Sequence, residues 1–291
     1  MPRMRQRFAP SPTGLLHIGH AFSAVTAWRG AQDAGGEFLL RIEDIDQPRC
    51  KPEFEQAIFD DLHWLGLSWP EPVMRQSERM PVYQKSLDRL VDMGLCFPCR
   101  CTRKDISAAL RAPQEGQEPA FGPDGLIYPG TCEDRPMSEK TDADAVRLSM
   151  RRSIQALGGA AAVGKLAYTE TGSGAEEQIT LSAADLIEGC GDIVLARKDI
   201  GTSYHLAVVV DDAEQEITHV TRGRDMAAAT RIHRLLQALL GLPTPVYHHH
   251  RLIRDENGKR LAKRDDARSI RSYRDAGLSP TEVLALVGLQ A

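Results

Sequence analysis

The sequence predicts an α/β protein built on a parallel, doubly wound sheet. A short apolar stretch before residue 9 is followed by apolar side chains at helical spacing, among them Ile18 and Phe22. Residues 37–42 then form a nearly continuous apolar run, which is typical of a strand in a sheet covered on both faces. Helical spacing returns over residues 52–65. This alternation of strand and helix favours parallel pairing with helices on both faces.

The later elements continue this alternation. We expect an amphipathic helix over 81–94, with Gly94 as its C-cap. The elements predicted after it are short strands at 146–150, 178–181 and 192–197, a helix at 204–212, a strand at 217–221, a turn at 222–223, a helix at 227–240, a strand from 245, a turn at 257–258 and two short terminal helices. Two stretches rich in glycine, proline or alanine, 111–125 and 156–178, are expected to have little regular structure.

These elements divide the chain into four predicted parts. Residues 1–95 are expected to form the first half of the nucleotide-binding domain, and 96–190 an insertion with a metal-binding subdomain. Residues 191–245 are expected to form the second half of the domain. The last part, 246–291, is expected to hold a basic loop and a short helical end.

The composition excludes several classes of protein. Hydrophobic residues make up 42% and charged residues 26%, as in a soluble globular protein. There is no charged start before an apolar run and no stretch long enough to span a bilayer, so we expect a cytoplasmic protein. The net charge of −4 argues against a protein that coats nucleic acid non-specifically. Six cysteines, three of them within 96–101, favour a metal site over a secreted disulfide framework.

The segment 7–20 (RFAPSPTGLLHIGH) is the strongest candidate for a nucleotide site. Its two prolines end a strand, and a helix then begins near His17 and His20. Unpaired N–H groups at a helix N-terminus attract phosphate, and imidazole N–H donors there can stabilise charge on a phosphoryl group. Gly19 leaves space for a flat ring against the backbone. The residues alone leave a plainer alternative open, which is two surface histidines at the start of a helix.

Two motifs in order resemble those of a known family. The segment 7–20 and the segment 41–49 (RIEDIDQPR) resemble the ATP signature and the amino-acid-binding strand of class I glutamyl-tRNA synthetases. The resemblance implies their Rossmann-type fold, with ATP and Mg²⁺ as co-substrate. For ATP it implies Pro10, Ser11, His17, Gly19, His20 and Lys263. For glutamate it implies Arg7, Ala9, Ser11, Glu43, Tyr204 and Arg222. The catalytic residues that it implies are His17, His20 and Lys263.

The resemblance also implies a role for each polar residue of the glutamate site. Arg7 and Arg222 would bind the substrate carboxylates through the planar fork of the guanidinium group. Glu43 would hold the ammonium group, and Tyr204 would orient the substrate side chain.

The cysteines near residue 100 form a candidate zinc site. Thiolates bind zinc tetrahedrally, and pairs one or two residues apart on a tight loop can reach one ion. The residues alone allow an all-thiolate site of Cys96, Cys99, Cys101 and Cys132. The resemblance implies instead one structural zinc ion held by Cys99, Cys101, Tyr128 and Cys132. Three consecutive histidines, 248–250, fall on a predicted strand, and we do not expect them to hold a metal.

Residues 260–264 (RLAKR) resemble the mobile KMSKS loop of class I synthetases, with Lys263 on the second lysine of that motif. Cations on such a loop can close on the triphosphate and stabilise the transition state of adenylate formation. Arg260 replaces the first lysine of the motif, so charge is kept there, whereas Ala262 and Arg264 occupy its serine positions, so a hydroxyl group is lost.

The chain as a whole resembles a truncated branch of the family. The sequence ends 27 residues after Arg264, which leaves room for about two short helices, and no anticodon-binding domain is expected. This early end of the sequence and the zinc-bearing insertion resemble those of the paralogues that modify queuosine. The resemblance implies ATP-dependent, tRNA-independent activation of L-glutamate and its transfer to the queuosine base at the wobble position of tRNA(Asp). The implied partners are L-glutamate, ATP and queuosine-bearing tRNA(Asp), with no membrane, and a monomer is expected.

Two alternatives remain open. The first is a glutamyl-tRNA synthetase without its anticodon domain, which would charge the 3′ end of tRNA(Glu). The second is a non-catalytic RNA-binding module that keeps the fold but not the turnover.

Overall fold

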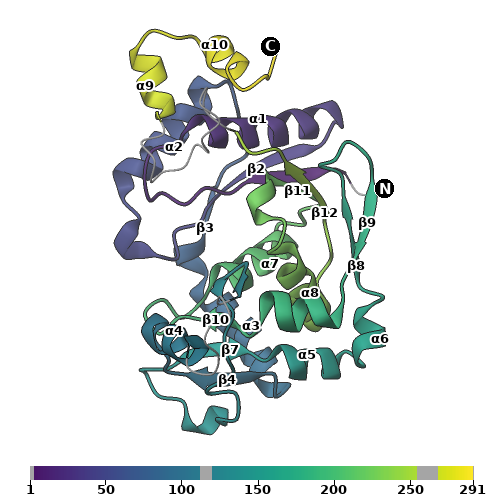
Figure 1. The fold of residues 1–291 in the computed structure, drawn as a ribbon. Helices are drawn as coiled ribbons and strands as arrows, with labels where there is room; N and C mark the ends of the chain where they lie inside the picture. The colour runs from purple at the N-terminus through teal and green to yellow at the C-terminus, as the bar shows by residue number, and fades with distance from the viewer. Residues whose placement is uncertain (1–2, 112–119, 254–267, 291) are drawn as a thin grey trace.

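The structure is a computed structural model that describes residues 3–111, 120–253 and 268–290. Strands and helices alternate along most of the chain (Figure 1). The strands are β1 (Arg5–Phe8), β2 (Glu37–Ile42), β3 (Met74–Arg75), β4 (Cys96–Cys99), β5 (Phe121–Gly122), β6 (Gly125–Leu126), β7 (Ala145–Leu148), β8 (Ala167–Glu170), β9 (Glu177–Thr180), β10 (Ile193–Ala196), β11 (His219–Gly223) and β12 (Val246–His250). The helices are α1 (Ile18–Asp33), α2 (Pro52–Trp64), α3 (Met80–Asp92), α4 (Arg103–Arg111), α5 (Met150–Ala156), α6 (Ala160–Val163), α7 (Tyr204–Glu214), α8 (Thr230–Leu240), α9 (Ile270–Asp275) and α10 (Pro280–Ala285).

The main sheet has the strand order β3-β2-β1-β11-β12-β8-β9. Its neighbours pair in parallel except for β8 and β9, which are antiparallel. Helix α1 covers one face, while α7 and α8 lie on the other side of the sheet (Figure 1). The predicted α/β fold with a parallel, doubly wound sheet is therefore confirmed. None of the helices in the described part of the chain has the length and apolarity needed to cross a bilayer.

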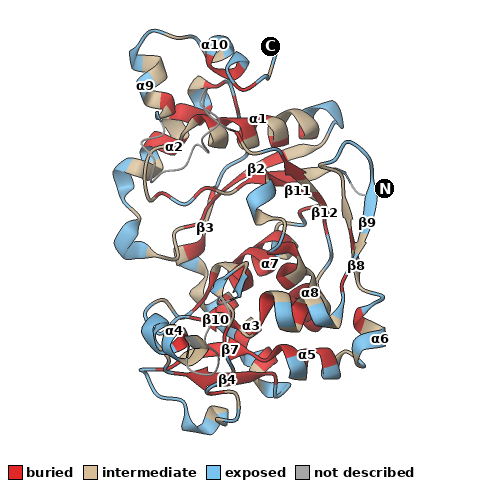
Figure 2. Cartoon of the chain, in the orientation of Figure 1, coloured by how far each residue is buried: buried red, intermediate tan, exposed pale blue. Residues whose placement is uncertain are grey.

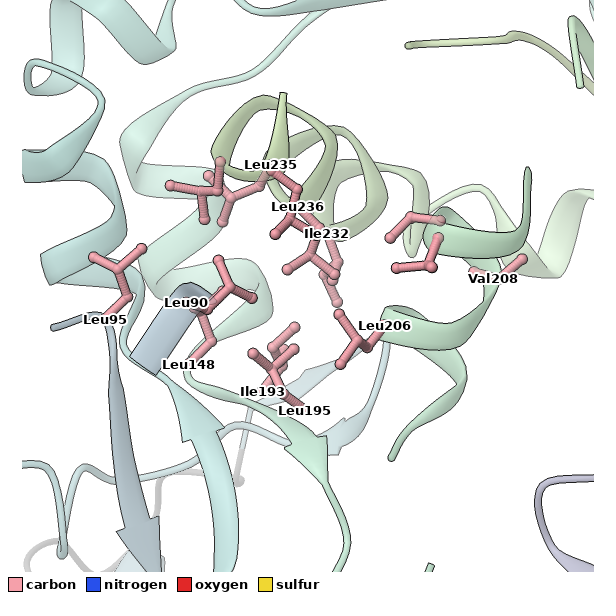
Figure 3. Close-up of a cluster of buried hydrophobic side chains, with 14 of the residues drawn as sticks. Leu90, Leu95, Leu148, Ile193, Leu195, Leu206, Val208, Ile232, Leu235 and Leu236 are labelled. Carbon is pink, nitrogen blue, oxygen red and sulfur yellow. The ribbon is translucent and has the colours of Figure 1, made fainter. Parts of the chain in front are cut away.

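A second sheet belongs to the insertion. Its three strands, β10, β7 and β4, are antiparallel. Side chains from this sheet and from α3, α7 and α8 share one core, in which Leu90, Leu148, Ile193, Leu206 and Ile232 meet (Figure 3). The buried residues in Figure 2 lie mainly in the two sheets and on the helix faces that cover them. The insertion therefore packs against the nucleotide fold through a continuous apolar core.

The end of α3 differs by one residue from the prediction. Met93 is the C-cap, and Gly94 follows it with a φ of 74°. The Gly94 N–H donates to the Val91 carbonyl at 2.8 Å. Glycine adopts this left-handed conformation without steric cost. Gly94 does end the helix as expected, but it occupies the position after the C-cap and not the C-cap itself.

Two predictions of irregular structure were wrong. Residues 156–178 contain α6 and β8. The Tyr168 ring of β8 packs edge-on against the Tyr247 ring, with the ring centroids 5.4 Å apart. The predicted turn at 222–223 is the end of β11, because both residues pair with β12. In both places pairing with a distant strand outweighs the local preference of the residues. The predicted turn at 257–258 lies outside the described residues.

Strand pairing crosses two of the predicted domain boundaries. Strands β8 and β9 lie within 96–190, but they extend the main sheet beside β12. Strand β10 lies within 191–245, but it pairs with β7 in the insertion. The two sheets therefore exchange strands across the predicted boundaries. The division of the chain into four parts remains a prediction.

Candidate active site and candidate metal centre

A cavity of about 1230 Å³ opens beyond the carboxyl ends of the central strands. Its lining includes Ser11 after β1, Glu43 after β2, Tyr204 at the start of α7 and Cys101 of the insertion. Open α/β sheets bind ligands at this edge, where strand order reverses on either side of the first strand. The cavity runs without interruption from the predicted glutamate site to the predicted metal centre.

His17 and His20 cap the first turn of α1. His17 Nδ1 accepts a hydrogen bond from the Gly19 N–H at 3.1 Å, and His20 Nδ1 accepts one from the His17 N–H at 3.2 Å. The two rings stack with centroids 3.7 Å apart. Because each Nδ1 is an acceptor, a neutral ring carries its proton on Nε2. The helix N-terminus thus holds two imidazole rings in the donor form expected for a phosphate site.

Gly19 leaves room for this arrangement, though not in the way expected from the sequence. A Cβ at Gly19 would lie 3.0 Å from Cε1 of His17, tighter than most such contacts, so the imidazole ring would have to shift by a few tenths of an ångström. The flat ring that occupies the space beside the glycine is therefore the His17 imidazole itself.

Lys263 and the rest of the predicted basic loop lie outside the described residues. The residues on either side of that range reach the same helix end. Ile253 packs against Phe22 of α1, and Ser269 forms an antiparallel bridge with His17. Ile253 and Ser269, the described residues on either side of the basic loop, therefore both lie near the start of α1.

The loop after β1 connects the two predicted substrate sites. Pro10 is buried, and its carbonyl accepts the Glu43 N–H at 3.0 Å. Ser11 is exposed on the cavity wall, while Ala9 is half-buried. One backbone hydrogen bond thus fixes the nucleotide loop relative to the strand that carries Glu43.

Arg7 and Glu43 belong to a buried network of charges. Asp212 accepts from Arg7 Nε at 2.9 Å and Nη2 at 3.3 Å, and from Arg41 Nη1 at 2.8 Å. Arg41 also donates to Glu43 at 3.1 Å. Burial favours a raised pKa for Asp212, but Arg7 and Arg41 outweigh it and lower the pKa. Burial raises the pKa of Glu43 despite the same arginines.

Sequence reasoning missed two members of this network. Arg41 is fully buried and Asp212 nearly so. A signal was present, because an arginine inside a strand predicted to be covered on both faces needs a carboxylate partner. The next residue back, Asp211, accepts from Gln76, Arg79 and Tyr83, each at 2.8 Å. The two adjacent aspartates thus share Arg41, while Asp212 also binds Arg7 and Asp211 also binds Arg79.

Arg222 and Tyr204 meet beside this network. Arg222 Nη1 donates to the Tyr204 hydroxyl at 3.3 Å. Burial raises the pKa of Tyr204, and the charges that act on its hydroxyl include Arg222, Glu43 and Arg7. The four polar residues predicted for glutamate are therefore gathered around one point. No carboxylate among the described residues forms an ion pair with Arg222, whereas Arg7 is bound on two nitrogens by Asp212.

The predicted metal ligands come together in the insertion. In the described ranges, the thiol sulfurs of Cys99, Cys101 and Cys132 lie within 4.8 Å of one another. The Tyr128 hydroxyl lies 3.4 Å from the Cys99 sulfur and 3.6 Å from the Cys101 sulfur. A tetrahedral zinc ion holds its sulfur ligands about 3.8 Å apart. The sulfurs of Cys101 and Cys132 are 3.6 Å apart, so this donor set fits such an ion.

Cys96 does not reach this cluster. It lies three residues before Cys99 on β4, so the two side chains point to opposite faces of the strand. Cys96 is buried in the core with Leu148. Burial raises the pKa of its thiol to about 12. The all-thiolate alternative is therefore not the set of residues that the fold brings together.

The three consecutive histidines face different neighbours. His248 Nδ1 lies 3.0 Å from the Thr171 hydroxyl, and His250 Nε2 lies 2.6 Å from the Ser23 hydroxyl. His249 faces the opposite side of β12 and contacts Arg222. His233 and His249, which sequence reasoning did not assign to the site, both touch this guanidinium.

Comparison with known proteins agrees with this geometry. A family model described as tRNA synthetases class I (E and Q), catalytic domain, matches residues 3–290. A protein from Rhodobacter capsulatus named glutamyl-Q tRNA(Asp) synthetase is 51% identical over 289 residues, which is 98% of this chain and 100% of that protein. A protein of the same name from Nocardia farcinica is 40% identical, over 97% of this chain and 82% of its own length.

A solved structure gives the same fold. The glutamate-tRNA synthetase from Elizabethkingia anophelis superimposes with a TM-score of 0.76 at 24% identity. The match covers 99% of this chain and 61% of that synthetase, so the chain spans about three fifths of its length. With the family match over nearly every residue and relatives of 51% and 40% identity, the chain belongs to the glutamyl-Q tRNA(Asp) synthetase family of class I tRNA synthetases.

Proposed function

We propose that this protein activates L-glutamate with ATP, without a need for tRNA, and transfers the glutamyl group to queuosine at the wobble position of tRNA(Asp). One observation carries the proposal. Arg222, a buried arginine that forms no ion pair with any carboxylate in residues 3–111, 120–253 and 268–290, lies at the same sheet edge as a helix N-terminus capped by His17 and His20. The first suits a carboxylate substrate and the second a triphosphate.

The glutamate site uses residues around Tyr204. Arg222 and Arg7 bind carboxylate groups, while Glu43 binds the ammonium group and Tyr204 orients the side chain. Arg222 is the stronger anion site of the two arginines, because Asp212 already occupies two nitrogens of Arg7. Ala9 and Ser11 complete the floor of the site.

The activation step joins a carboxylate oxygen of glutamate to the α-phosphorus of ATP and releases pyrophosphate. Pro10, Ser11 and Gly19 shape the nucleotide loop, and the Nε2–H groups of His17 and His20 stabilise the charge that develops on the phosphoryl oxygens. Lys263 adds a cation from the basic loop. Mg²⁺ binds with the triphosphate.

The transfer step joins the acyl carbon to a hydroxyl of the cyclopentenediol in queuosine and releases AMP. The cavity beyond Tyr204 is the route for that base, because it extends to the insertion. Its rim carries cations from the insertion, including Arg100 and Arg103. These can contact the RNA backbone.

A zinc ion would be held by Cys99, Cys101, Tyr128 and Cys132. Four protein ligands leave no open position, so its contribution is to fix the fold of the insertion.

The test is ATP–pyrophosphate exchange with glutamate in the absence of RNA. Exchange is expected in the parent protein and in Arg224→Ala, an exposed neighbour, and is expected to be lost in Arg222→Ala. Exchange that appears only after addition of tRNA(Glu) would identify a shortened glutamyl-tRNA synthetase. Its absence under every condition would leave an RNA-binding module.

The acceptor is then tested with radiolabelled glutamate and three RNAs. Queuosine-bearing tRNA(Asp) is expected to accept label, and the same tRNA without its 3′-terminal adenosine should accept it equally. tRNA(Asp) with guanine in place of queuosine should accept none. Label that requires the 3′ adenosine would contradict transfer to the base.

A further inference from the structure

The guanidinium of Arg222 is surrounded by neutral acceptors. Its Nε donates to His249 Nε2 at 3.1 Å, and its Nη1 contacts His233 Nδ1 at 3.3 Å. Its Nη2 donates to the Thr230 hydroxyl at 2.7 Å and to the Met226 carbonyl at 3.3 Å. A guanidinium can only donate, so each of these atoms must accept. The two imidazole nitrogens that face Arg222 therefore carry no proton.

This requirement fixes the tautomer of His249. With Nε2 as acceptor, the proton of the neutral ring is on Nδ1, where it meets a carboxylate oxygen of Glu170. The other oxygen of Glu170 accepts the backbone N–H of Gly172 at 2.7 Å and that of His249 at 3.0 Å. Glu170 is thus held in place by the backbone and orients the ring.

The same reasoning fixes His233. With Nδ1 as acceptor toward Arg222, its proton is on Nε2, which lies 3.1 Å from His205 Nδ1. His205 Nε2 in turn lies 3.6 Å from a carboxylate oxygen of Asp124. Both chains of contacts run outward from Arg222 through imidazole rings and end on a carboxylate. Neither carboxylate touches the guanidinium.

Arg7 and Arg222 differ in whether a carboxylate touches the guanidinium directly. Asp212 binds Arg7 directly and neutralises its charge. Around Arg222 the carboxylates are one or two rings away, so the hydrogen bonds are satisfied while the positive charge is not. We propose that His249 and His233, in fixed neutral tautomers, are positioning residues that hold Arg222 ready for the substrate carboxylate, with Glu170 setting the tautomer of His249.

The surroundings oppose protonation of both rings. His249 is faced by Arg222 of β11, Glu170 of β8, Thr230 of α8 and its neighbour His248. Burial and Arg222 lower its pKa to about 4, with Glu170 acting in the opposite direction.

His233 is faced by Arg222, by His205 of α7, by Arg7 of β1 and by His249. Burial, with Arg222 and Arg7, lowers its pKa well below the usual value. Near neutral pH both rings therefore keep an acceptor nitrogen for Arg222.

The first experiment compares two substitutions of one ring. His249→Gln places an amide oxygen near the position of Nε2 and keeps an acceptor, whereas His249→Leu removes it. The KM for glutamate in ATP–pyrophosphate exchange should rise about 10- to 100-fold in His249→Leu, the loss typical of a hydrogen bond to a charged group. It should stay within about threefold of the parent in His249→Gln. The KM for ATP should not change in either variant.

His219→Leu is the matched control, because His219 lies on the same strand as Arg222 and contacts Thr218 rather than the guanidinium. Equal KM values for glutamate in His249→Leu and the parent would overturn the positioning role. So would a KM for ATP that rises with the KM for glutamate.

The second experiment reads the tautomers directly and needs no substrate. In protein labelled with ¹⁵N-histidine, NMR at pH 7 should show His249 protonated on Nδ1 and His233 on Nε2. Glu170→Gln should shift the His249 signals and leave those of His219 unchanged. A His249 ring protonated on Nε2 would refute the inference, even if His249→Leu fails to fold.

The inference rests on the proposed function for the identity of the ligand, and the two can fail separately. If the tautomers are as stated but the parent protein shows no exchange with glutamate, the proposed function fails. If exchange is robust but the tautomers differ, the positioning role fails.

Discussion

Asp212→Asn tests whether the buried charge network holds the site together. Three carboxylates, Glu43, Asp211 and Asp212, form ion pairs with three arginines, Arg7, Arg41 and Arg79. The charges of this set therefore cancel. Asparagine keeps the shape and one acceptor oxygen of Asp212 but leaves one buried positive charge without a partner.

The magnitude follows from the burial of the partners. Asp212 is 7% exposed, Arg7 4% and Arg41 0%, so water cannot compensate the lost charge. Removal of one partner of a buried pair costs about 3–5 kcal/mol. For a chain of this size we expect the midpoint of thermal unfolding to fall by about 6–10 °C.

The assay is scanning calorimetry of the parent and the variant at neutral pH. Asp199→Asn is the control, since Asp199 pairs with Arg197 at 2.6 Å but its side chain is 56% exposed. An exposed pair contributes about 1 kcal/mol or less, so this midpoint should move by no more than about 2 °C. If Asp212→Asn unfolds within about 2 °C of the parent, the charges do not stabilise the site as the structure implies.

Three further outcomes are expected. Elemental analysis of protein purified without chelator should find one zinc ion per chain, which Cys101→Ser loses and Cys96→Ser keeps; a parent without zinc would contradict the four-ligand site. Because the pKa of His249 is lowered from 6.5 to about 4, its contribution to stability is present above pH 6.5 and is lost as the pH falls toward 4. The unfolding free energy of the parent should therefore fall by about 3 kcal/mol more than that of His249→Gln between these pH values, and parallel curves would refute this. Leu148→Ala should cost about 2–5 kcal/mol in urea unfolding, whereas Leu286→Ala, at a side chain that is 58% exposed, should cost little; equal effects would contradict the shared core.

Much of the fold follows from the period of the apolar residues. The strand at 37–42 and the helix near 52–65 lie where the pattern of apolar residues placed them, because β2 is buried within the sheet and α2 packs its apolar face against it. The order of strands and helices was sufficient to predict a parallel sheet. Strand β8 could not be predicted in the same way, since it is only four residues long, lies in a stretch rich in glycine and alanine, and forms by pairing with β9 and β12.

For the candidate site too, the sequence determined one part of the chemistry and the tertiary structure another. The sequence by itself determined which residue types were available, because His17, Gly19 and His20 sit in one motif and the cysteines near residue 100 are close in the chain. It also indicated the family through those motifs.

Only the tertiary structure decided which charges are already paired. Arg7 and Asp212 are far apart in the sequence, and so are Arg222 and Glu170, yet each pair belongs to one buried network. How strongly a buried arginine can bind an anionic ligand depends on whether a carboxylate already touches it, and that contact is set by packing between distant segments. The sequence thus determined the groups that could bind glutamate, and the fold decided that Asp212 pairs with Arg7, whereas no carboxylate in the part of the chain that the structure describes pairs with Arg222.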